Sequence, residues 1–286
     1  MAGSFKVAII GANGQLGSEL MVAAGGRAIA LTHQDIDVTD REGVFAVLRS
    51  TGAEAVINTA AFHHLEACAK EPEKAFAVNA IGAGNVAWAA RELGMRSVYL
   101  STDYVFGRQP GPHTEESCPG PVNVYGVSKL AGEELVLLAD PNAVVVRVAG
   151  LFGRAGASGK GGNFLEAILG RAKRGEPIRV VSDQRTSPTY AKDAAEAILA
   201  LALPGKSGIY HVTNQGSCTW YELAQAAVNL AGFKVPVTAI SSREFPSSVS
   251  RPADSSLVSL RTTPLRRWEE GLVAYLTEKQ WLTPSS

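Results

Sequence analysis

The stretch "KVAIIGANGQLGSEL" (residues 6–20) decides the fold of this chain. It joins an apolar, β-branched run to a helical pattern through three glycines, Gly11, Gly14 and Gly17. A turn with these residues lets a pyrophosphate approach the backbone, because glycine has no Cβ, and it holds the ligand at a helix N-terminus. A plain strand–helix turn could also contain three glycines, so the surrounding pattern has to discriminate between the two.

Strand and helix patterns alternate through the first half of the chain. Short apolar runs predict buried strands, and longer stretches with helical spacing separate them. We expect strands at residues 6–11, 28–31, 55–58, 97–101 and 143–148, and helices at 15–25, 41–50, 72–94 and 124–139. This order predicts an α/β fold, a Rossmann-like, doubly wound parallel sheet covered by helices on both faces.

The second half of the chain has a looser pattern. Loops rich in Gly, Ser and Pro separate helices that we expect at about residues 163–174, 192–203 and 219–232. We therefore predict a dinucleotide-binding domain at residues 1–150. Residues 151–286 are expected to form a smaller, mainly substrate-binding lobe, with some segments returning to the main sheet.

Composition argues against several functional classes. The 27 Lys and Arg residues balance the 27 Asp and Glu residues, so no broad attraction to nucleic acid or to an anionic membrane is expected. No uninterrupted apolar run approaches the roughly 18–20 residues of a membrane span. The three cysteines are scattered, and the adjacent His63 and His64 lack ligand spacing, so we predict no disulfide frame and no metal site. The expectation is a cytoplasmic protein.

The segment "VYGVSKLAGEE" (residues 124–134) places Tyr125 and Lys129 four residues apart on a predicted helix. Residues at this spacing share one helical face. A phenol has a pKa of about 10, so it exchanges protons poorly near neutral pH unless a nearby cation stabilises its anion. Lys129 can supply that charge and can also hold the ribose of a nicotinamide cofactor. A second such pair, Tyr275 and Lys279, has no strand edge upstream and is expected on a solvated surface.

Thr102 is the third catalytic candidate. It closes the strand pattern of "SVYLSTDYVFG" (residues 97–107), so it is expected at the carboxyl edge of the sheet, where ligands bind in open α/β folds. Its hydroxyl would hydrogen-bond the reacting oxygen.

Motifs along almost the whole chain resemble the extended short-chain dehydrogenase/reductase family, and within it the dTDP-4-dehydrorhamnose reductases. The matching stretches include "GANGQLG", "LSTDYVFG", "PVNVYGVSKLAGEE", "GGNFLEAIL", "SDQRTSPTYAKDAA" and "RPADSSL". The resemblance implies hydride transfer from NADPH or NADH to C4 of a nucleotide-linked 4-keto-6-deoxy sugar. It implies Tyr125 as the proton donor and leaves a homodimer open as the assembly.

Site residues follow from the same resemblance. Beyond the three glycines, Tyr125 and Lys129, the cofactor would contact Gln15, Leu16, Asp37, Val38, Ala60, Ala61 and Phe62. The substrate would contact Thr102, Asp103, Asn163 and Arg251, the last two near its diphosphate. After the second strand, Thr32, His33 and Gln34 are neither acidic nor clearly suited to a 2′-phosphate, so the choice between NADH and NADPH stays open.

Three departures from the family pattern fall near the expected sugar pocket. Gly150 stands where the family usually has a tryptophan, Gly107–Arg108 replaces an Asp–Gly pair, and Arg185–Thr186 alters the "DQxGSPT" pattern. These leave open a reductase of another dTDP-4-keto-6-deoxyhexose. A further alternative is a non-catalytic dinucleotide-binding subunit similar to the regulatory subunit of methionine adenosyltransferase, which shares "STDYVF". The complete set of Thr102, Tyr125 and Lys129 favours an enzyme.

Overall fold

A six-stranded sheet, in which every neighbouring pair of strands is parallel, forms the centre of the molecule. The computed structural model describes residues 5–155, 162–244 and 247–282. In spatial order the strands are β10 (Gly208–His211), β5 (Val144–Val148), β4 (Arg96–Thr102), β3 (Ala55–Asn58), β1 (Val7–Ile10) and β2 (Ala28–Leu31). The order reverses between β1 and β3, which creates a crevice at the carboxyl ends of the strands. The predicted doubly wound parallel sheet is confirmed.

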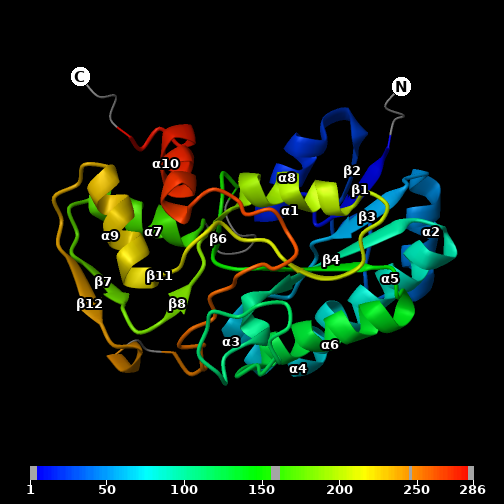
Figure 1. Ribbon diagram of the computed structural model, residues 1–286, viewed down its shortest axis with the longest axis horizontal. Helices are drawn as coiled ribbons and strands as arrows, with labels where there is room; N and C mark the ends of the chain where they lie inside the picture. The colour runs from blue at the N-terminus through cyan, green and yellow to red at the C-terminus, as the bar shows by residue number, and fades with distance from the viewer. Residues whose placement is uncertain (1–4, 156–161, 245–246, 283–286) are drawn as a thin grey trace.

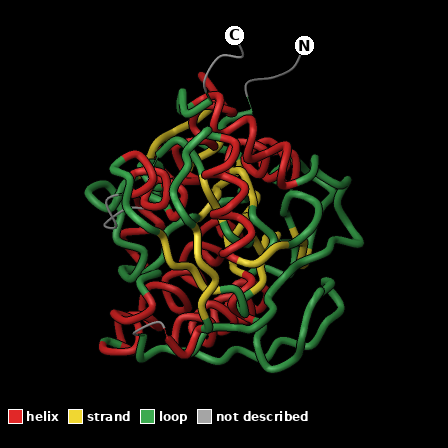
Figure 2. The backbone as a smooth tube through the Cα atoms, turned by 90° about the vertical axis from the view of Figure 1, so that its left-hand side faces the viewer, coloured by secondary structure: helices red, strands yellow, loops and turns green. Residues whose placement is uncertain are grey.

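Helices cover both faces of this sheet (Figures 1 and 2). On one face lie α1 (Gln15–Ala24) and α8 (Ala191–Leu201); on the other lie α2 (Arg41–Thr51), α5 (Ala83–Glu92) and α6 (Val124–Ala139). The sequence of β1 is apolar at every position because both faces of the strand are covered by helices. Val7 and Ile9 pack into the first of these layers, Ala8 and Ile10 pack into the second, and all four are buried.

A smaller lobe lies beside the carboxyl end of the sheet (Figure 1). Its core joins α7 (Phe164–Lys173), α9 (Trp220–Leu230) and α10 (Trp268–Glu278) to the parallel strands β7 (Ile178–Val181) and β12 (Val237–Ile240). Two short strand pairs connect it to the sheet: β6 (Leu151–Phe152) with β9 (Thr189–Tyr190), and β8 (Arg185–Thr186) with β11 (Cys218–Thr219).

Two elements from the second half of the chain belong to the main sheet. Strand β10 pairs with β5, and α8 packs against α1 through alanines such as Ala191, Ala194 and Ala195. From the sequence, some segments of the second half are expected to return to the main sheet; the structure identifies β10 and α8 as such segments. Short segments complete the chain: η1 (Gly25–Arg27), α3 (Leu65–Lys70), α4 (Pro72–Phe76), the π-helical η2 (Ala77–Gly82), η3 (Asp103–Val105) and η4 (Ser242–Glu244).

The prediction that Tyr275 lies on a solvated surface is wrong. Tyr275 is fully buried in α10, where its ring meets those of Phe152 and Tyr190 edge-on. Its hydroxyl is within hydrogen-bonding distance of the side chain of Asn163. The helix pattern near the C-terminus is amphipathic, and only the packing of the smaller lobe decides that its tyrosine faces inward. Within the described residues, no helix has the length and apolar character needed to traverse a bilayer.

Close packing between α1 and the turn after β1 requires glycine at position 17. A Cβ on Gly17 would lie 2.1 Å from the carbonyl oxygen of Gly11, which is far inside van der Waals contact. That oxygen also accepts a hydrogen bond from the backbone N–H of Gly14, so it cannot easily move. The glycine triplet therefore sets how closely the first helix approaches the sheet.

We expect Gly17→Ala to destabilise the protein by about 1–3 kcal/mol, because the added methyl group overpacks a rigid backbone contact. The measurement is the free energy of unfolding in denaturant. Gly26→Ala is the matched control, since nothing lies within 4 Å of its Cβ position. Equal stability of the two variants would contradict the proposed contact.

Candidate active site

Two adjoining cavities open at the carboxyl edge of the sheet. The first has a volume of about 730 Å³ and extends from the glycine turn after β1 to α6. The second, of about 630 Å³, lies between the end of β4 and the smaller lobe. Both cavities are lined by His63, Ser101, Tyr125, Val148, Leu151 and Phe164. Tyr125, predicted to be catalytic, therefore lies where the two cavities meet.

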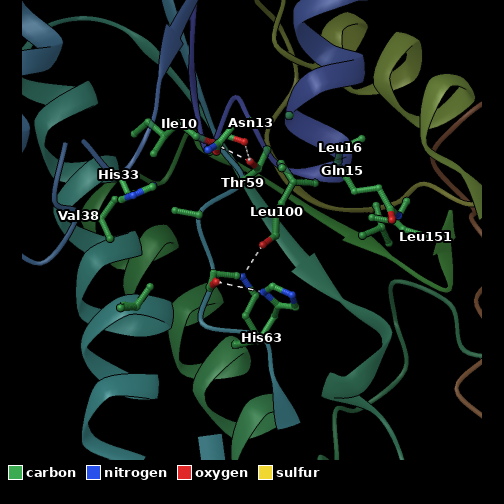
Figure 3. A pocket seen from close by; sticks show the side chains of 18 of the residues that line it. Ile10, Asn13, Gln15, Leu16, His33, Val38, Thr59, His63, Leu100 and Leu151 are labelled. Atoms are coloured by element: carbon green, nitrogen blue, oxygen red, sulfur yellow. Dashed lines mark hydrogen bonds between the residues drawn. The ribbon is translucent and has the colours of Figure 1, made fainter. Parts of the chain in front are cut away.

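The first cavity contains most of the residues predicted to bind a dinucleotide. Figure 3 shows Gln15, Leu16 and Leu151 on one side of the cavity, and His33 and Val38 on the other. The predicted residues in its wall are Gly11, Gly14, Gln15, Leu16, Gly17, Asp37, Val38, Ala60, Ala61, Tyr125 and Lys129.

Phe62 is the one predicted cofactor residue that does not line either of the two cavities. Its backbone is instead bonded to the buried side chain of Asn79 in η2: the N–H of Phe62 donates to Oδ1, and its carbonyl accepts from Nδ2. The same Nδ2 donates to Ser128 of α6 at 2.9 Å. Asn79 thus ties the loop after β3 to the helix that carries Tyr125. This role of Asn79 cannot be recognised from the sequence, where the only signal is an amide side chain inside an otherwise apolar helical pattern.

Helix α6 packs unusually closely on its neighbours. A Cβ on Gly126 would lie 2.1 Å from the carbonyl oxygen of Tyr104, and a Cβ on Gly132 would lie 2.2 Å from that of Asn79. The side chain of Asn123 caps the helix by accepting from the N–H of Gly126. Tyr125 and Lys129 are consequently carried by a helix that is held at its N-terminus and at its middle.

Burial raises the pKa of the Tyr125 phenol above its ordinary value of 10, and a hydrogen-bonding contribution from Thr102 opposes this rise. The nearby carboxyl of Asp103 raises it further. The expectation that Lys129 lowers this pKa is wrong for this structure, because burial dominates and the net shift is upward. The phenol is therefore protonated at neutral pH, as a proton donor needs to be.

Lys129 is buried beneath the end of β4. Its Nζ donates to the carbonyl oxygen of Leu100 at 2.6 Å and lies 4.1 Å from the centre of the Tyr99 ring. Burial lowers the pKa of Lys129 to about 7, while the carboxylate of Glu133 acts in the opposite direction.

Thr102 and Asp103 lie at the end of β4, in the wall of the second cavity. The hydroxyls of Thr102, Thr186 and Ser255 all donate to the carboxyl of Asp103, at 3.1, 3.3 and 2.5 Å. Burial raises the pKa of Asp103 to about 6, and these hydrogen bonds limit the rise. Two of the three donors come from the second half of the chain, so both halves build this part of the site.

Four arginines line the second cavity, and each forms an ion pair with a glutamate. Arg251 was predicted from the sequence, and its Nη2 lies 3.1 Å from Glu66. The other pairs are Arg171–Glu176, Arg179–Glu244 and Arg185–Glu222. Guanidinium groups suit the oxygens of a diphosphate, which could replace a carboxylate partner.

Trp220 lines the second cavity and meets Phe164 edge-on, with ring centroids 4.7 Å apart. Trp220 also packs against the core of the smaller lobe, so it belongs both to that core and to the cavity wall. His211, at the end of β10, is fully buried next to β5.

Asn163 lies in the wall of the first cavity and is absent from that of the second, although it was predicted to contact the substrate. It caps α7: its Oδ1 accepts from the N–H of Glu166, and its Nδ2 donates to the carbonyl of Gly153. Asn163 precedes the first turn of α7, and an asparagine at such a position is bound to backbone N–H groups that the helix leaves unpaired. These bonds explain why its side chain is held at the end of α7.

Gly150 occupies the second cavity wall with φ of +49°, a conformation that favours glycine. A Cβ here would lie 3.2 Å from the Cα of Pro188 and 3.3 Å from the side chain of Thr186. The family that this chain resembles usually has a tryptophan at this position. A tryptophan would not fit this backbone without rearrangement. Thr186, another departure from the family pattern, occupies the adjacent space and bonds Asp103.

His63 lines both cavities, and its Nδ1 lies 3.4 Å from the carbonyl oxygen of Ala61. From the sequence, His63 and His64 were assessed only as metal ligands. The position of His63 in the walls of both cavities is seen only in the structure. In the parts of the chain that the structure describes, no three His, Cys, Asp or Glu residues gather in a way that could hold a metal ion.

Comparison with known proteins gives consistent results. A family model described as RmlD substrate binding domain matches residues 5–281. The dTDP-4-dehydrorhamnose reductase of Mycobacterium tuberculosis (strain CDC 1551 / Oshkosh) is 38% identical, with 96% of this chain and 94% of that protein covered. The spore coat polysaccharide biosynthesis protein SpsK of Bacillus subtilis (strain 168) is 37% identical, with 96% and 98% covered.

The fold comparison includes a crystal structure of dTDP-4-dehydrorhamnose reductase (rfbD) from Bacillus anthracis str. Ames in complex with NADP. It superposes with a TM-score of 0.90 at 35% identity and covers 96% of this chain and 99% of that chain.

We expect Asp103 to make stability depend on pH. Its folded pKa of about 6 exceeds its ordinary 3.8, so the folded chain binds more protons between these values, and the stability due to this group falls as pH rises through that window. At about 1.4 kcal/mol per unit, and because the unfolded carboxyl is already partly ionised at pH 4, the unfolding free energy of the wild type relative to Asp103→Asn should fall by roughly 2 kcal/mol between pH 4 and pH 7.

Asp35→Asn provides a control of opposite sign. Hydrogen bonds from Thr32 lower the pKa of the exposed Asp35, so its stabilising contribution does not fall as pH rises. Denaturant unfolding across the pH range measures both differences. If the difference in unfolding free energy between the wild type and Asp103→Asn did not change with pH, the buried carboxyl would have an ordinary pKa.

Proposed function

The chain belongs to the RmlD substrate binding domain family, and from this premise we propose that it is an NAD(P)H-dependent reductase of a nucleotide-linked 4-keto-6-deoxy sugar. The simplest substrate is dTDP-4-dehydro-L-rhamnose, which would be reduced to dTDP-L-rhamnose. The observation that carries this proposal is the position of Tyr125, where the cavity beside the glycine turn meets the cavity lined by arginines.

The residues of the first cavity fit a nicotinamide dinucleotide. Gly14 at the N-cap of α1 has no side chain to cover the helix N-terminus, so the backbone N–H groups can face a pyrophosphate. Asp37 and Val38 lie where the adenosine end would rest, and Ala60 and Ala61 line the path toward Tyr125. Bound NADPH or NADH would supply the hydride.

The chemistry needs a proton as well as a hydride. When C4 of the keto sugar accepts the hydride, its oxygen takes up a proton, and the protonated phenol of Tyr125 is positioned to give it. The Thr102 hydroxyl is proposed to hydrogen-bond the same oxygen. Lys129 supplies positive charge that stabilises the phenolate formed after the transfer. Asp103 is proposed to bind a neighbouring sugar hydroxyl.

The second cavity fits the rest of the substrate. We propose that Arg251, assisted by a further arginine of the cavity wall, holds the diphosphate, and that Trp220 offers an aromatic surface to the base. Asn163 then contributes by shaping the α7 end of the first cavity, where its capping bonds hold it. In this division residues 1–150, with α8 and β10, form the cofactor-binding domain and contribute Thr102 and Asp103 to the sugar site, and the remainder of 151–286 forms a mainly substrate-binding lobe.

Gly150 favours a second candidate, a reductase of another dTDP-4-keto-6-deoxyhexose. The backbone at Gly150 and the adjacent Thr186 give the sugar pocket a wall unlike the tryptophan-containing one of the resembling family. The reaction and the catalytic residues are the same in both candidates.

The direct test is a panel of nucleotide-linked 4-keto sugars incubated with NADH or NADPH. We expect loss of absorbance at the reduced-nicotinamide band with dTDP-4-dehydro-L-rhamnose, or with another dTDP-4-keto-6-deoxyhexose if the second candidate holds. Cofactor binding without turnover on any of these sugars would favour a non-catalytic dinucleotide-binding subunit instead.

For the catalytic residues, we expect Tyr125→Phe to lower kcat by at least about 100-fold, because the proton donor is removed. Its affinity for the cofactor should stay close to that of the wild type in a fluorescence titration. Tyr275→Phe is the control: it removes a hydroxyl bonded to Asn163 and should cost about 1 kcal/mol of stability while kcat is retained. Comparable loss of kcat in both variants would show that Tyr125 is not the donor.

A further inference from the structure

Two charged side chains are buried beside Lys129 and are not used by the reaction described above. Glu133 of α6 and Arg147 of β5 are each only 1% exposed, as is Lys129 itself. Charges removed from water to this degree destabilise a protein unless they are paired and hydrogen-bonded. We therefore ask what the buried charges of Glu133 and Arg147 do for Lys129, the site residue beside them.

The carboxylate of Glu133 is fixed on both oxygens. Arg147 donates to it through two nitrogens, from Nε to Oε1 at 2.9 Å and from Nη2 to Oε2 at 2.6 Å. The hydroxyl of Ser101 donates to Oε1 at 2.5 Å. The ion pair and the three hydrogen bonds hold this carboxylate in one orientation.

Ser101 and Lys129 connect this carboxylate to the cavities. Ser101 lies in the wall of both cavities, next to Leu100, whose carbonyl oxygen accepts the hydrogen bond from Lys129. Glu133 lies one helical turn after Lys129 on α6, so the two side chains share a face.

In the described parts of the chain, the other titratable groups that face the pair do not supply a negative charge to Lys129. From β4 the Tyr99 ring faces it, and burial raises the pKa of Tyr99, so this phenol is neutral. Tyr125 on α6 is neutral for the same reason, and Cys68 of α3 faces Tyr125. Behind Arg147, burial lowers the pKa of His211 to about 4, so this imidazole is uncharged near pH 7.

The proposal rests on the reductase function above. We propose that Glu133 is a positioning residue that keeps the buried ammonium of Lys129 charged, and that Arg147 and Ser101 hold the Glu133 carboxylate in place for this purpose. Without Glu133 the buried cations Lys129 and Arg147 would lose the carboxylate that, among the described residues, bonds Arg147 and raises the pKa of Lys129; the Glu115 carboxylate behind Arg147 bonds the backbone N–H of His211 instead. Lys129 is the one that can lose its proton, because arginine keeps its charge.

The charges and the burial around Lys129 support this direction. Burial lowers the pKa of Lys129 to about 7, and Glu133 is the group that raises it. Loss of Glu133 would leave Lys129 neutral over more of the working pH range, and the neutral amine could no longer stabilise the phenolate of Tyr125.

The test compares Glu133→Gln with Glu134→Gln, the adjacent residue on the exposed side of the helix. The readout is the pH profile of kcat at saturating cofactor and sugar nucleotide. Glu133→Gln should move the alkaline limb to lower pH by roughly one unit and lower kcat at pH 8 about 10-fold, with KM for the sugar nucleotide little changed. Glu134→Gln should give the wild-type profile.

A double variant separates this role from a structural one. Glu133→Gln with Arg147→Gln removes the unpaired buried guanidinium and so relieves the main cause of misfolding in the single variant. If Glu133 acts on Lys129, the double variant keeps an alkaline limb below that of the wild type. Return of the limb to its wild-type position in a folded double variant, or a lowered kcat with an unmoved limb in the single variant, would overturn the proposal.

Failure of the function and failure of this inference give different results. If the wild type reduces no keto-sugar nucleotide, the function itself is wrong. In that case the pH dependence of cofactor binding by the wild type and Glu133→Gln replaces kcat as the readout, and identical profiles would overturn the inference.

Discussion

The close approach of α6 to its neighbours is the constraint on which the site depends. Gly126, directly after Tyr125, and Gly132, three residues after Lys129, contact backbone carbonyl oxygens so closely that no Cβ fits at either position. A helix held this way cannot rotate or slide to suit a ligand. It places the phenol of Tyr125 at the junction of the two cavities and Lys129 beneath the end of β4, so the reacting groups are positioned before any ligand binds.

Burial is the second determinant, and it acts on each ionisable group differently. It keeps the Tyr125 phenol protonated, brings the pKa of Lys129 to about 7 and raises that of Asp103 to about 6. The partners of each group then limit these effects: hydroxyl donors for Asp103 and the Glu133 carboxylate for Lys129. A proton donor, a buried cation and a partly neutral acid can therefore lie near one another at the edge of one sheet.

The second half of the chain completes the site and does more than enclose a substrate. Ser255 and Thr186 bond the carboxyl of Asp103 at the end of β4, and Arg251 reaches Glu66 of α3. Strand β10 and helix α8 return to the main sheet. The sugar pocket is thus built from segments far apart in the sequence, which is why substitutions such as Gly150 and Thr186 can reshape it without disturbing the helix that carries Tyr125.

The sequence by itself determined the parallel sheet, the glycine turn and the Tyr125–Lys129 pair, because local patterns encode them: apolar runs of strand length, glycines at a turn and a four-residue helical spacing. Only the tertiary structure decided that Tyr275 is buried, that Asn79 ties the loop after β3 to α6, that Asn163 caps α7, and that Glu133 and Arg147 pair behind Lys129. Each of these depends on residues distant in the chain meeting in space, and both burial and charge pairing arise only at that point.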